Sequence, residues 1–340
     1  MTTQVSSKVN SLGDWTFLAV EKHFQKTLNH EPEVLKDKDP EELHQMRVGM
    51  RRLRSAVNGF GPVVILPKEV QDKKIGKVAR CLGGLRDLDV LLEALENRYK
   101  PNLPAPEKAE LDKVMHQLIK QRRQAFKKVR EMLGHKSYLI LKQKLQEWLE
   151  EPIYTNISQL PIQEVLPDLL LPEISQLFLH PAWLVGVEKE DLEKTDNHNF
   201  LLQQTNSKHQ VFVHKNYDSV IKLTLSEEEC LHSLRKEVKR VRYQMSLFTD
   251  FYGSTYKAYL QDMKDIQEYL GEIQDIAVLT EFMENILQSK IHKILPTLAE
   301  QLKQKREQEL HKWQLLQRRY LNTQVRHSFR SELLRPLSSY

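Results

Sequence analysis

The stretch HQMRVGMRRLR at residues 44–54 decides the fold, because it returns in related form as HSLRKEVKRVR at residues 232–242, 188 positions later. A second pair of stretches keeps the same offset, with LGGLRDLDVL at 82–91 and LGEIQDIAVL at 270–279. Two pairs that share one offset indicate an internal repeat. We therefore predict two homologous halves that are related by a pseudo-twofold axis.

The repeated stretches are predicted to be helices, since their apolar residues recur every three or four positions. The first helix should begin at Asp39 and Pro40, an N-cap followed by proline at the first helical position. The second should begin with a capping box at Ser226. We expect these helices to end near Pro62 and Gly253. Further amphipathic helices are predicted at about 67–98, 107–134, 137–150, 255–290 and 297–330.

Composition favours an all-helical protein. Hydrophobic residues form 40% of the 340-residue chain, enough for a sizeable core, and only 11 residues are glycine. A β-sandwich or β-barrel would need more turn residues. Five prolines and a polar run at 188–199 mark residues 151–225 as a connector, with a short hairpin predicted at 211–225. The predicted single domain covers residues 1–335, with helical halves at 10–150 and 226–335.

Cysteine usage and the start of the chain bear on its location. The two cysteines, Cys81 and Cys230, have no CxxC or zinc-type spacing and cannot make a disulfide framework. No basic segment followed by an apolar run opens the sequence, and no run of about 18 apolar residues occurs. We expect a cytoplasmic protein that does not span a membrane.

On a helical wheel the cations of each repeat gather on one stripe, within an arc of roughly 80° in the first repeat. The first basic stripe is His44, Arg47, Arg51 and Arg54, and the second is His232, Arg235, Lys239 and Arg242, widened by Lys236 and Tyr243. A separate face of each helix is apolar and predicted to be core. These faces are Met46, Met50, Leu53, Val57 and Phe60, and Leu234, Val238, Val241, Met245 and Phe248.

The basic stripes need a compensating charge. Like charges three and four residues apart repel one another, and residues 44–54 contain no carboxylate. A basic face is most often simply solvated, but a solvated face has no reason to repeat the same residue types at the same positions. Phosphate would suit the stripes, because arginine offers a bidentate fork and lysine a mobile point charge. The net charge is only +5, so this attraction depends on where the charges lie.

His44 and His232 have two interpretations. Each could donate a hydrogen bond to phosphate, in which case the anion would raise the pKa of the imidazole, or each could bond to a backbone carbonyl. Metal ligation is disfavoured, because neither repeat supplies another histidine or a cysteine three or four residues away. In the second block, Asp87 and its counterpart Asp275 are predicted to orient a neighbouring arginine or to cap a turn. Arg86 could reach a ligand, but Gln274 stands at its place in the second half.

These residues resemble the CHAD family, a helical domain named for its histidines, over nearly the whole chain. HQMRVGMRRLRSAVNGF with LGGLRDLDVLLEAL is similar to the first signature pair of the family, and LHSLRKEVKRVRYQMSLF with LGEIQDIAVL to its second. The resemblance implies two pseudo-symmetric four-helix bundles around a basic central channel. It also implies binding of inorganic polyphosphate, often at polyphosphate granules.

The resemblance implies a set of binding residues on both repeat helices. These are His44, Arg47, Arg51, Arg54, His232, Arg235, Lys236, Lys239, Arg242 and Tyr243. Arg52 and Arg240, which the repeat pairs with each other, and Arg86 complete the predicted set.

The sequence suggests three candidate functions. A non-catalytic polyphosphate-binding module needs only clustered cations, and other polyanions are candidate partners. An enzyme acting on phosphoanhydrides would need metal-binding carboxylates or a GxxxxGK[ST] loop, and the isolated Glu188 and Glu190 do not extend to ExExK. A nucleic-acid-binding protein would need stacking aromatics, yet none lies within residues 44–54. We therefore predict binding without catalysis, with no cofactor and no metal.

Overall fold

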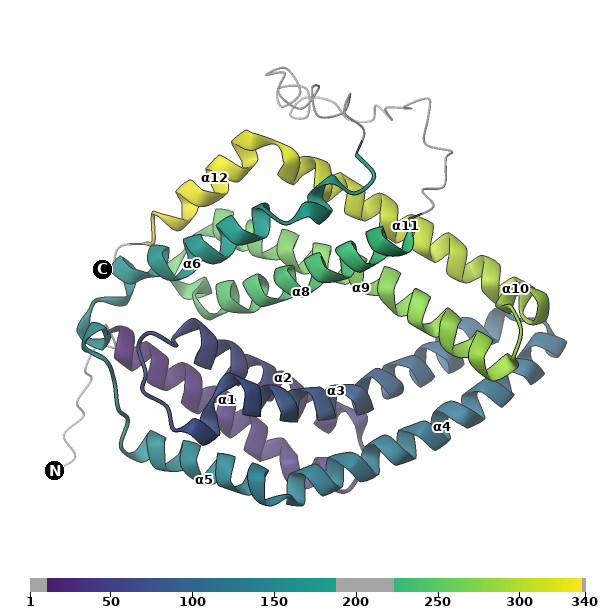
Figure 1. Ribbon diagram of the computed structural model, residues 1–340, viewed down its shortest axis with the longest axis horizontal. Helices are drawn as coiled ribbons and strands as arrows, with labels where there is room; N and C mark the ends of the chain where they lie inside the picture. The colour runs from purple at the N-terminus through teal and green to yellow at the C-terminus, as the bar shows by residue number, and fades with distance from the viewer. Residues whose placement is uncertain (1–10, 188–222, 338–340) are drawn as a thin grey trace. The chain divides into compact units, whose positions relative to one another are not determined.

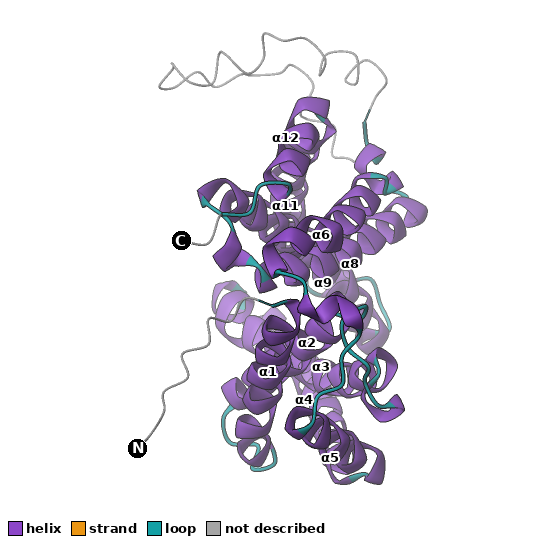
Figure 2. Cartoon of the chain, turned by 90° about the vertical axis from the view of Figure 1, so that its left-hand side faces the viewer, coloured by secondary structure: helices purple, strands orange, loops and turns teal. Residues whose placement is uncertain are grey.

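The chain is helical throughout the part that is described. The structure is a computed structural model that describes residues 11–187 and 223–337. Figure 2 shows helices joined by loops, and within these residues extended segments meet only at two isolated bridges, Ser11 with Pro161 and Val64 with Tyr154. The predicted all-α fold is confirmed. The polar run at 188–199, and the hairpin predicted at 211–225 up to residue 222, lie outside the described residues.

The helices are named in chain order in Figure 1. The first five are α1 (Leu12–Val34), α2 (Pro40–Gly59), α3 (Asp72–Ala94), α4 (Ala105–Gly134) and α5 (Lys136–Glu150). The others are α6 (Ile162–Phe178), α8 (Leu225–Leu247), α9 (Ser254–Leu287), α10 (Ile291–Ile294), α11 (Pro296–Leu321) and α12 (Thr323–Leu333). The two basic stripes therefore lie on α2 and α8.

The helices form two compact units. The first unit is Met1–Leu169 with Leu279–Glu300, and the second is Leu170–Val278 with Gln301–Tyr340. Residues 279–300 thus belong with the N-terminal unit, whereas the predicted halves divide the chain at the connector. One reason is Glu107 of α4, a buried carboxylate that accepts hydrogen bonds from the backbone N–H groups of Thr297 (3.1 Å) and Leu298 (3.2 Å) at the start of α11. The four-helix bundles and the basic channel stay predictions.

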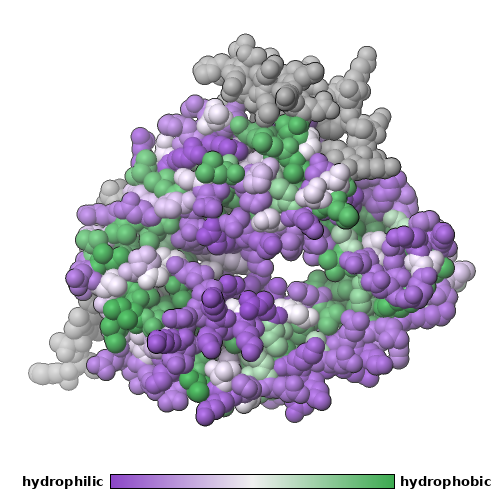
Figure 3. Space-filling model, viewed as in Figure 1, coloured by the Kyte–Doolittle hydropathy of each residue, from purple (hydrophilic) through white to green (hydrophobic). Residues whose placement is uncertain are grey.

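The apolar faces predicted for both repeat helices are confirmed as core. Every predicted core residue of α2 and α8 is buried, and Met46, Leu53, Leu234 and Val238 have no exposed surface. Hydrophilic residues predominate on the face drawn in Figure 3, where hydrophobic residues form separate patches. Because one side of each helix is fixed in the core, the basic side takes a defined direction.

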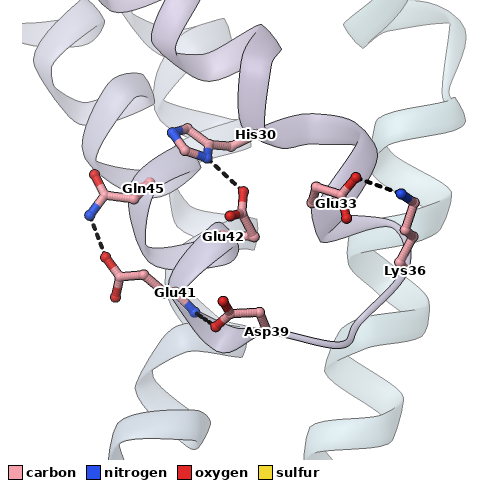
Figure 4. A network of polar contacts seen from close by, with 7 residues as sticks. All are labelled: His30, Glu33, Lys36, Asp39, Glu41, Glu42 and Gln45. Atoms are coloured by element: carbon pink, nitrogen blue, oxygen red, sulfur yellow. Dashed lines mark hydrogen bonds and ion pairs between the residues drawn. The ribbon is translucent and has the colours of Figure 1, made fainter.

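The N-terminus of α2 is held by polar contacts with α1 (Figure 4). Asp39 is the N-cap and accepts from the backbone N–H of Glu41 at 2.8 Å, as predicted. His30 of α1 contacts the Glu42 carboxylate at 2.7 Å through its Nδ1. The helix also ends as predicted, with Phe60 as its C-cap. These contacts fix where the first basic stripe begins.

The predicted limits of α8 are wrong at both ends. The capping box is formed by Thr224 and Glu227 instead of Ser226, with the Glu227 carboxylate accepting from the Thr224 N–H at 2.7 Å. Both threonine and serine match the S/T-x-x-E pattern, and the earlier box lengthens the helix. At the other end α8 stops at Leu247, not near Gly253. Its C-cap Phe248 stands 188 positions after Phe60, the C-cap of α2.

Residues 151–225, predicted as a connector, contain the helix α6. Pro167 and Pro172 lie inside it, although each proline removes a backbone donor from the helix. Leu166, Leu170 and Ile174, spaced four residues apart, are buried and give the helix an apolar face. Burial of this face outweighs the lost hydrogen bonds.

Two other helices differ from the sequence prediction. The stretch 297–330 forms α11 and α12, not one helix, because the side chain of Asn322 caps α12 by accepting from the N–H of Gln324 at 2.8 Å. Helix α1 was not among the predicted helices. It begins with a capping box in which Ser11 and Asp14 accept from each other's backbone N–H.

Close packing of α1 on α2 depends on Gly49. A Cβ atom at this position would lie 2.7 Å from Oγ1 and 3.0 Å from the backbone nitrogen of Thr27. The Thr27 hydroxyl already donates to the carbonyl of His23 at 2.9 Å. Since part of the obstacle is backbone, a side chain at position 49 would force the helices apart.

We predict that Gly49→Ala lowers the free energy of unfolding by about 1–3 kcal/mol, the usual result of overpacking a close contact. Chemical denaturation monitored by circular dichroism measures it. Gly84→Ala is the matched control, because Gly84 is in a helix and a Cβ there meets nothing within 4 Å. The control should gain roughly 0.5–1 kcal/mol from helix propensity. Equal effects of the two substitutions would contradict this account of the α1–α2 contact.

Candidate functional site

Helices α2 and α3 bring one histidine and three arginines of the first half together. His44, Arg47 and Arg51 are half-buried on α2, and Arg86 is half-buried on α3. Burial lowers the pKa of the His44 imidazole, and although Glu41 opposes this shift, the charges of Arg86, Arg47 and Arg51 lower the pKa further. The predicted grouping of His44, Arg47 and Arg51 is therefore observed, with Arg86 beside it.

Helix α8 presents the equivalent group in the second half. His232, Arg235 and Lys239 are half-buried, and Lys236 is exposed. Burial lowers the pKa of the His232 imidazole, and the positive charges of Lys236 and Arg235 add to the shift. The Nδ1 atom of His232 is buried without a hydrogen-bond partner among the described residues. The backbone-carbonyl interpretation therefore finds no support at His232 Nδ1.

Glycines on the neighbouring helices lie against arginines of the stripes. A Cβ at Gly271 of α9 would lie 3.0 Å from Nη2 and 3.2 Å from Nε of Arg235, closer than side chains normally pack. A Cβ at Gly83 of α3 would lie 3.6 Å from Nε of Arg47, which is an ordinary contact. Both the arginines and the glycines are 188 positions apart. The sequence contains this signal, since LGGLRDLDVL and LGEIQDIAVL both begin with Leu-Gly. The sequence alone assigns no role to the glycine.

The last arginine of each stripe is held differently. Arg54 makes two hydrogen bonds to Asp72 at the start of α3, at 2.6 Å and 2.9 Å, which lower the pKa of the Asp72 carboxyl. Arg242 instead lies over the ring of Tyr243, with 4.4 Å from its central carbon to the ring centroid. Tyr243 is buried, so its ring orients a cation.

Arg52 and Arg240 lie beside the stripes, and their part in binding stays a prediction. Arg240 is ion-paired with Glu173 of α6 at 2.5 Å and with Glu237 at 2.7 Å. Arg52 is exposed, and its charge acts on His23 of α1, whose pKa burial and nearby cations lower to about 4. The repeat pairs these two arginines with each other, and each directly follows a stripe residue, Arg51 or Lys239, so that it is turned by 100° from that residue around the helix.

The second block also contributes differently to the two halves. Arg86 lines a surface pocket with Asp89 and Arg122, and the Arg122 guanidinium is paired with Asp89 at 2.7 Å. At the place of Arg86 in the second half, Gln274 lines a small pocket with His232. Asp87 lies 3.5 Å from Nη2 of Arg47, a long contact that agrees with the predicted orienting role.

The site consists of cations whose hydrogen-bonding capacity is only partly used. The Nε atoms of Arg86, Arg235 and Arg242 are buried and have no hydrogen-bond partner among the described residues. A buried donor without a partner is costly, and an anion that reaches it would remove this cost. Within residues 11–187 and 223–337 no three His, Cys, Asp or Glu side chains are grouped to hold a metal ion. In the same residues no helix has the length and apolar character of a membrane span.

Comparisons with known proteins agree with this geometry. A family model described as CHAD domain matches residues 18–284. The chain belongs to the CHAD family. Among solved structures it is similar to the CHAD domain from the plant Ricinus communis, with 22% identity and a TM-score of 0.54, covering 98% of this chain and 96% of that chain. No curated protein matches it significantly.

A second similar structure is PptA from Streptomyces chartreusis, with 14% identity and a TM-score of 0.54. The match covers 93% of this CHAD chain and 99% of that chain. At these identities both structural matches support the fold alone. Family membership confirms the resemblance inferred from the repeated motifs.

The charge environment of the histidines gives a testable prediction. In Arg86→Gln the pKa of His44 should rise, because the substitution removes a nearby positive charge that disfavours the imidazolium. Arg52→Gln is the matched control, which should leave His44 unchanged and raise the pKa of His23. Histidine resonances followed by NMR across pH 3–8 measure both. Equal shifts of His44 in the two variants would contradict the grouping of His44 with Arg86.

Proposed function

We propose that this CHAD protein binds inorganic polyphosphate without catalysis. The binding residues are the half-buried cations of α2, α3 and α8, including Arg235, which faces α9. The observation that carries the proposal is the set of buried guanidinium Nε atoms of Arg86, Arg235 and Arg242, which lack hydrogen-bond partners among the described residues. Phosphate oxygens accept such hydrogen bonds strongly. Family membership agrees with this ligand, because binding of polyphosphate is the function that the sequence resemblance implies.

A polymer fits the stripes better than a single phosphate. The four cationic positions of each stripe extend over ten residues, or roughly 15 Å of helix. One phosphate could contact one or two of them, whereas a linear chain of phosphates could contact all of them. Close packing of Arg235 against Gly271 holds its guanidinium in place before ligand binds, which reduces the entropy lost on binding.

The test is calorimetric titration with long-chain polyphosphate at several salt concentrations. We expect salt-sensitive binding by the wild type. Arg47→Gln with Arg235→Gln should weaken binding at least about tenfold and make the dependence of log K on log salt shallower by roughly one to two units. Arg52→Gln with Arg240→Gln removes the same charge from the same two helices and is the matched control.

The control variant should retain affinity within about threefold, since long-range charge effects are screened at physiological salt. Equal losses in the two double variants would leave only non-specific attraction. No binding by the wild type would reject the proposal. Nucleic acid of similar charge should compete poorly, and phosphate released from the bound polymer would reveal catalysis.

Binding should be coupled to protonation of the histidines. Burial and nearby cations hold the pKa of His44 and His232 below the ordinary value, and a bound polyanion would raise both. The complex then binds more protons than the free protein. Affinity should therefore rise as pH falls through the pKa of the complex and level off below the pKa of the free protein.

This prediction is checked by calorimetry between pH 5 and 8 in buffers of different ionisation enthalpy, which detect proton uptake. Long-chain polymer keeps the contribution of terminal phosphates small. The double variant His44→Gln with His232→Gln should bind with a flatter pH dependence. An unchanged profile would assign the histidines a structural role only.

In cells, we place the protein in the cytoplasm at polyphosphate granules, which imaging of a tagged chain would test.

A further inference from the structure

The first basic stripe contains an internal anion at its C-terminal end. Both oxygens of Asp72 accept from Arg54, from Nε at 2.6 Å and from Nη2 at 2.9 Å. Asn58 also donates to Oδ1 of Asp72 at 2.8 Å. This bidentate geometry is the one that a phosphate would use on the same guanidinium. A phosphate that binds this edge of Arg54 must displace the carboxylate, and one that approaches the other edge meets a guanidinium whose charge Asp72 already neutralises.

Among the described residues, no carboxylate is hydrogen-bonded to Arg242, the last arginine of the second stripe. At the offset of 188, the place of Asp72 is taken by Leu260. Arg242 contacts the ring of Tyr243, and its buried Nε has no hydrogen-bond partner among the described residues. A ring attracts the face of a guanidinium and leaves the N–H groups at its edge available to an anion. A carboxylate uses those N–H groups itself.

The rest of the charge is nearly balanced between the halves. The first half has Arg47, Arg51, Arg54 and Arg86, and the second has Arg235, Lys236, Lys239 and Arg242. Asp87 approaches Arg47 at 3.5 Å, while Arg235 has no ion pair among the described residues. The two halves therefore supply equal numbers of arginine and lysine residues, and they differ at the last arginine, because Asp72 neutralises Arg54 while the buried Nε of Arg242 has no partner among the described residues.

We propose that Asp72 is a built-in competitor for phosphate, so that the second stripe binds a short phosphate chain more tightly than the first. This inference rests on the proposed function, because it assumes that both stripes accept phosphate. Asp72 is thus a specificity-determining residue. The second stripe would capture a chain first, and the first stripe would engage where the ligand is long or concentrated enough to displace the carboxylate.

The experiment is an NMR titration of the full chain with tripolyphosphate, with His44 and His232 as reporters of the two stripes. Their resonances are assigned with the single variants His44→Gln and His232→Gln. We expect the His232 signals to saturate at a concentration several-fold lower than the His44 signals. Simultaneous saturation, or earlier saturation of His44, would overturn the inference.

Equivalent substitutions in the two halves provide the matched comparison. Arg242→Gln should weaken tripolyphosphate binding at His232 by about tenfold, since it removes a charge-assisted hydrogen bond. Arg54→Gln should weaken binding at His44 by a much smaller factor, because Asp72 already occupies that guanidinium. Equal losses would overturn the inference.

Asp72→Asn tests the competitor directly. It should tighten binding reported by His44 several-fold and leave binding reported by His232 unchanged, while circular dichroism verifies that the variant folds. If Asp72→Asn leaves the His44 affinity unchanged, Asp72 is not a competitor. If neither tripolyphosphate nor long polymer binds the wild type, both the proposed function and the present inference are rejected. If both stripes bind tripolyphosphate with equal affinity, only the present inference is rejected.

Discussion

Burial of one apolar face on each of α2 and α8 is the constraint on which the basic stripes depend. Repulsion between like charges three and four residues apart costs a few tenths of a kcal/mol per pair. A fully buried Leu, Val, Met or Phe side chain contributes about 1.5–3 kcal/mol relative to exposure. All five residues of each predicted apolar face are buried. The core therefore stabilises each helix by more than the stripe destabilises it, and no carboxylate is needed within the stripe.

The same burial explains how much of the site was predictable. The stripes and their apolar faces depend on the period of one helix, so a helical wheel is sufficient to find them. The cap at Thr224 was missed because Ser226 fits the same pattern two residues later. The end of α8 was missed because Gly253 is a strong stop signal, although the repeat pointed to Phe248. Prolines concealed α6, whose buried apolar face includes Leu166, Leu170 and Ile174.

Contacts between side chains of two helices cannot be predicted from a helical wheel. Asp72 is 18 positions beyond Arg54 in the sequence, and only the packing of α3 on α2 places its carboxylate against the guanidinium. The ion pair of Arg240 likewise depends on Glu173 of α6, a helix that the sequence did not predict. The close contact of Arg235 with Gly271 is an intermediate case, since the repeat marks both residues but not their contact.

Charged residues of the two halves can differ without a change in the packing of the helices. A side chain at Gly271 would press on Arg235, and a smaller residue at Val238 would leave a cavity, so changes at such places disturb the fold or the seat of a cation. Exchanging a partly exposed carboxylate or arginine costs little stability, typically about 0–1 kcal/mol for a surface ion pair. Asp72 and Leu260, or Arg86 and Gln274, can therefore differ at little cost in stability. Two sequences that keep a buried apolar face beside a basic stripe can thus differ in their affinity for the same anion.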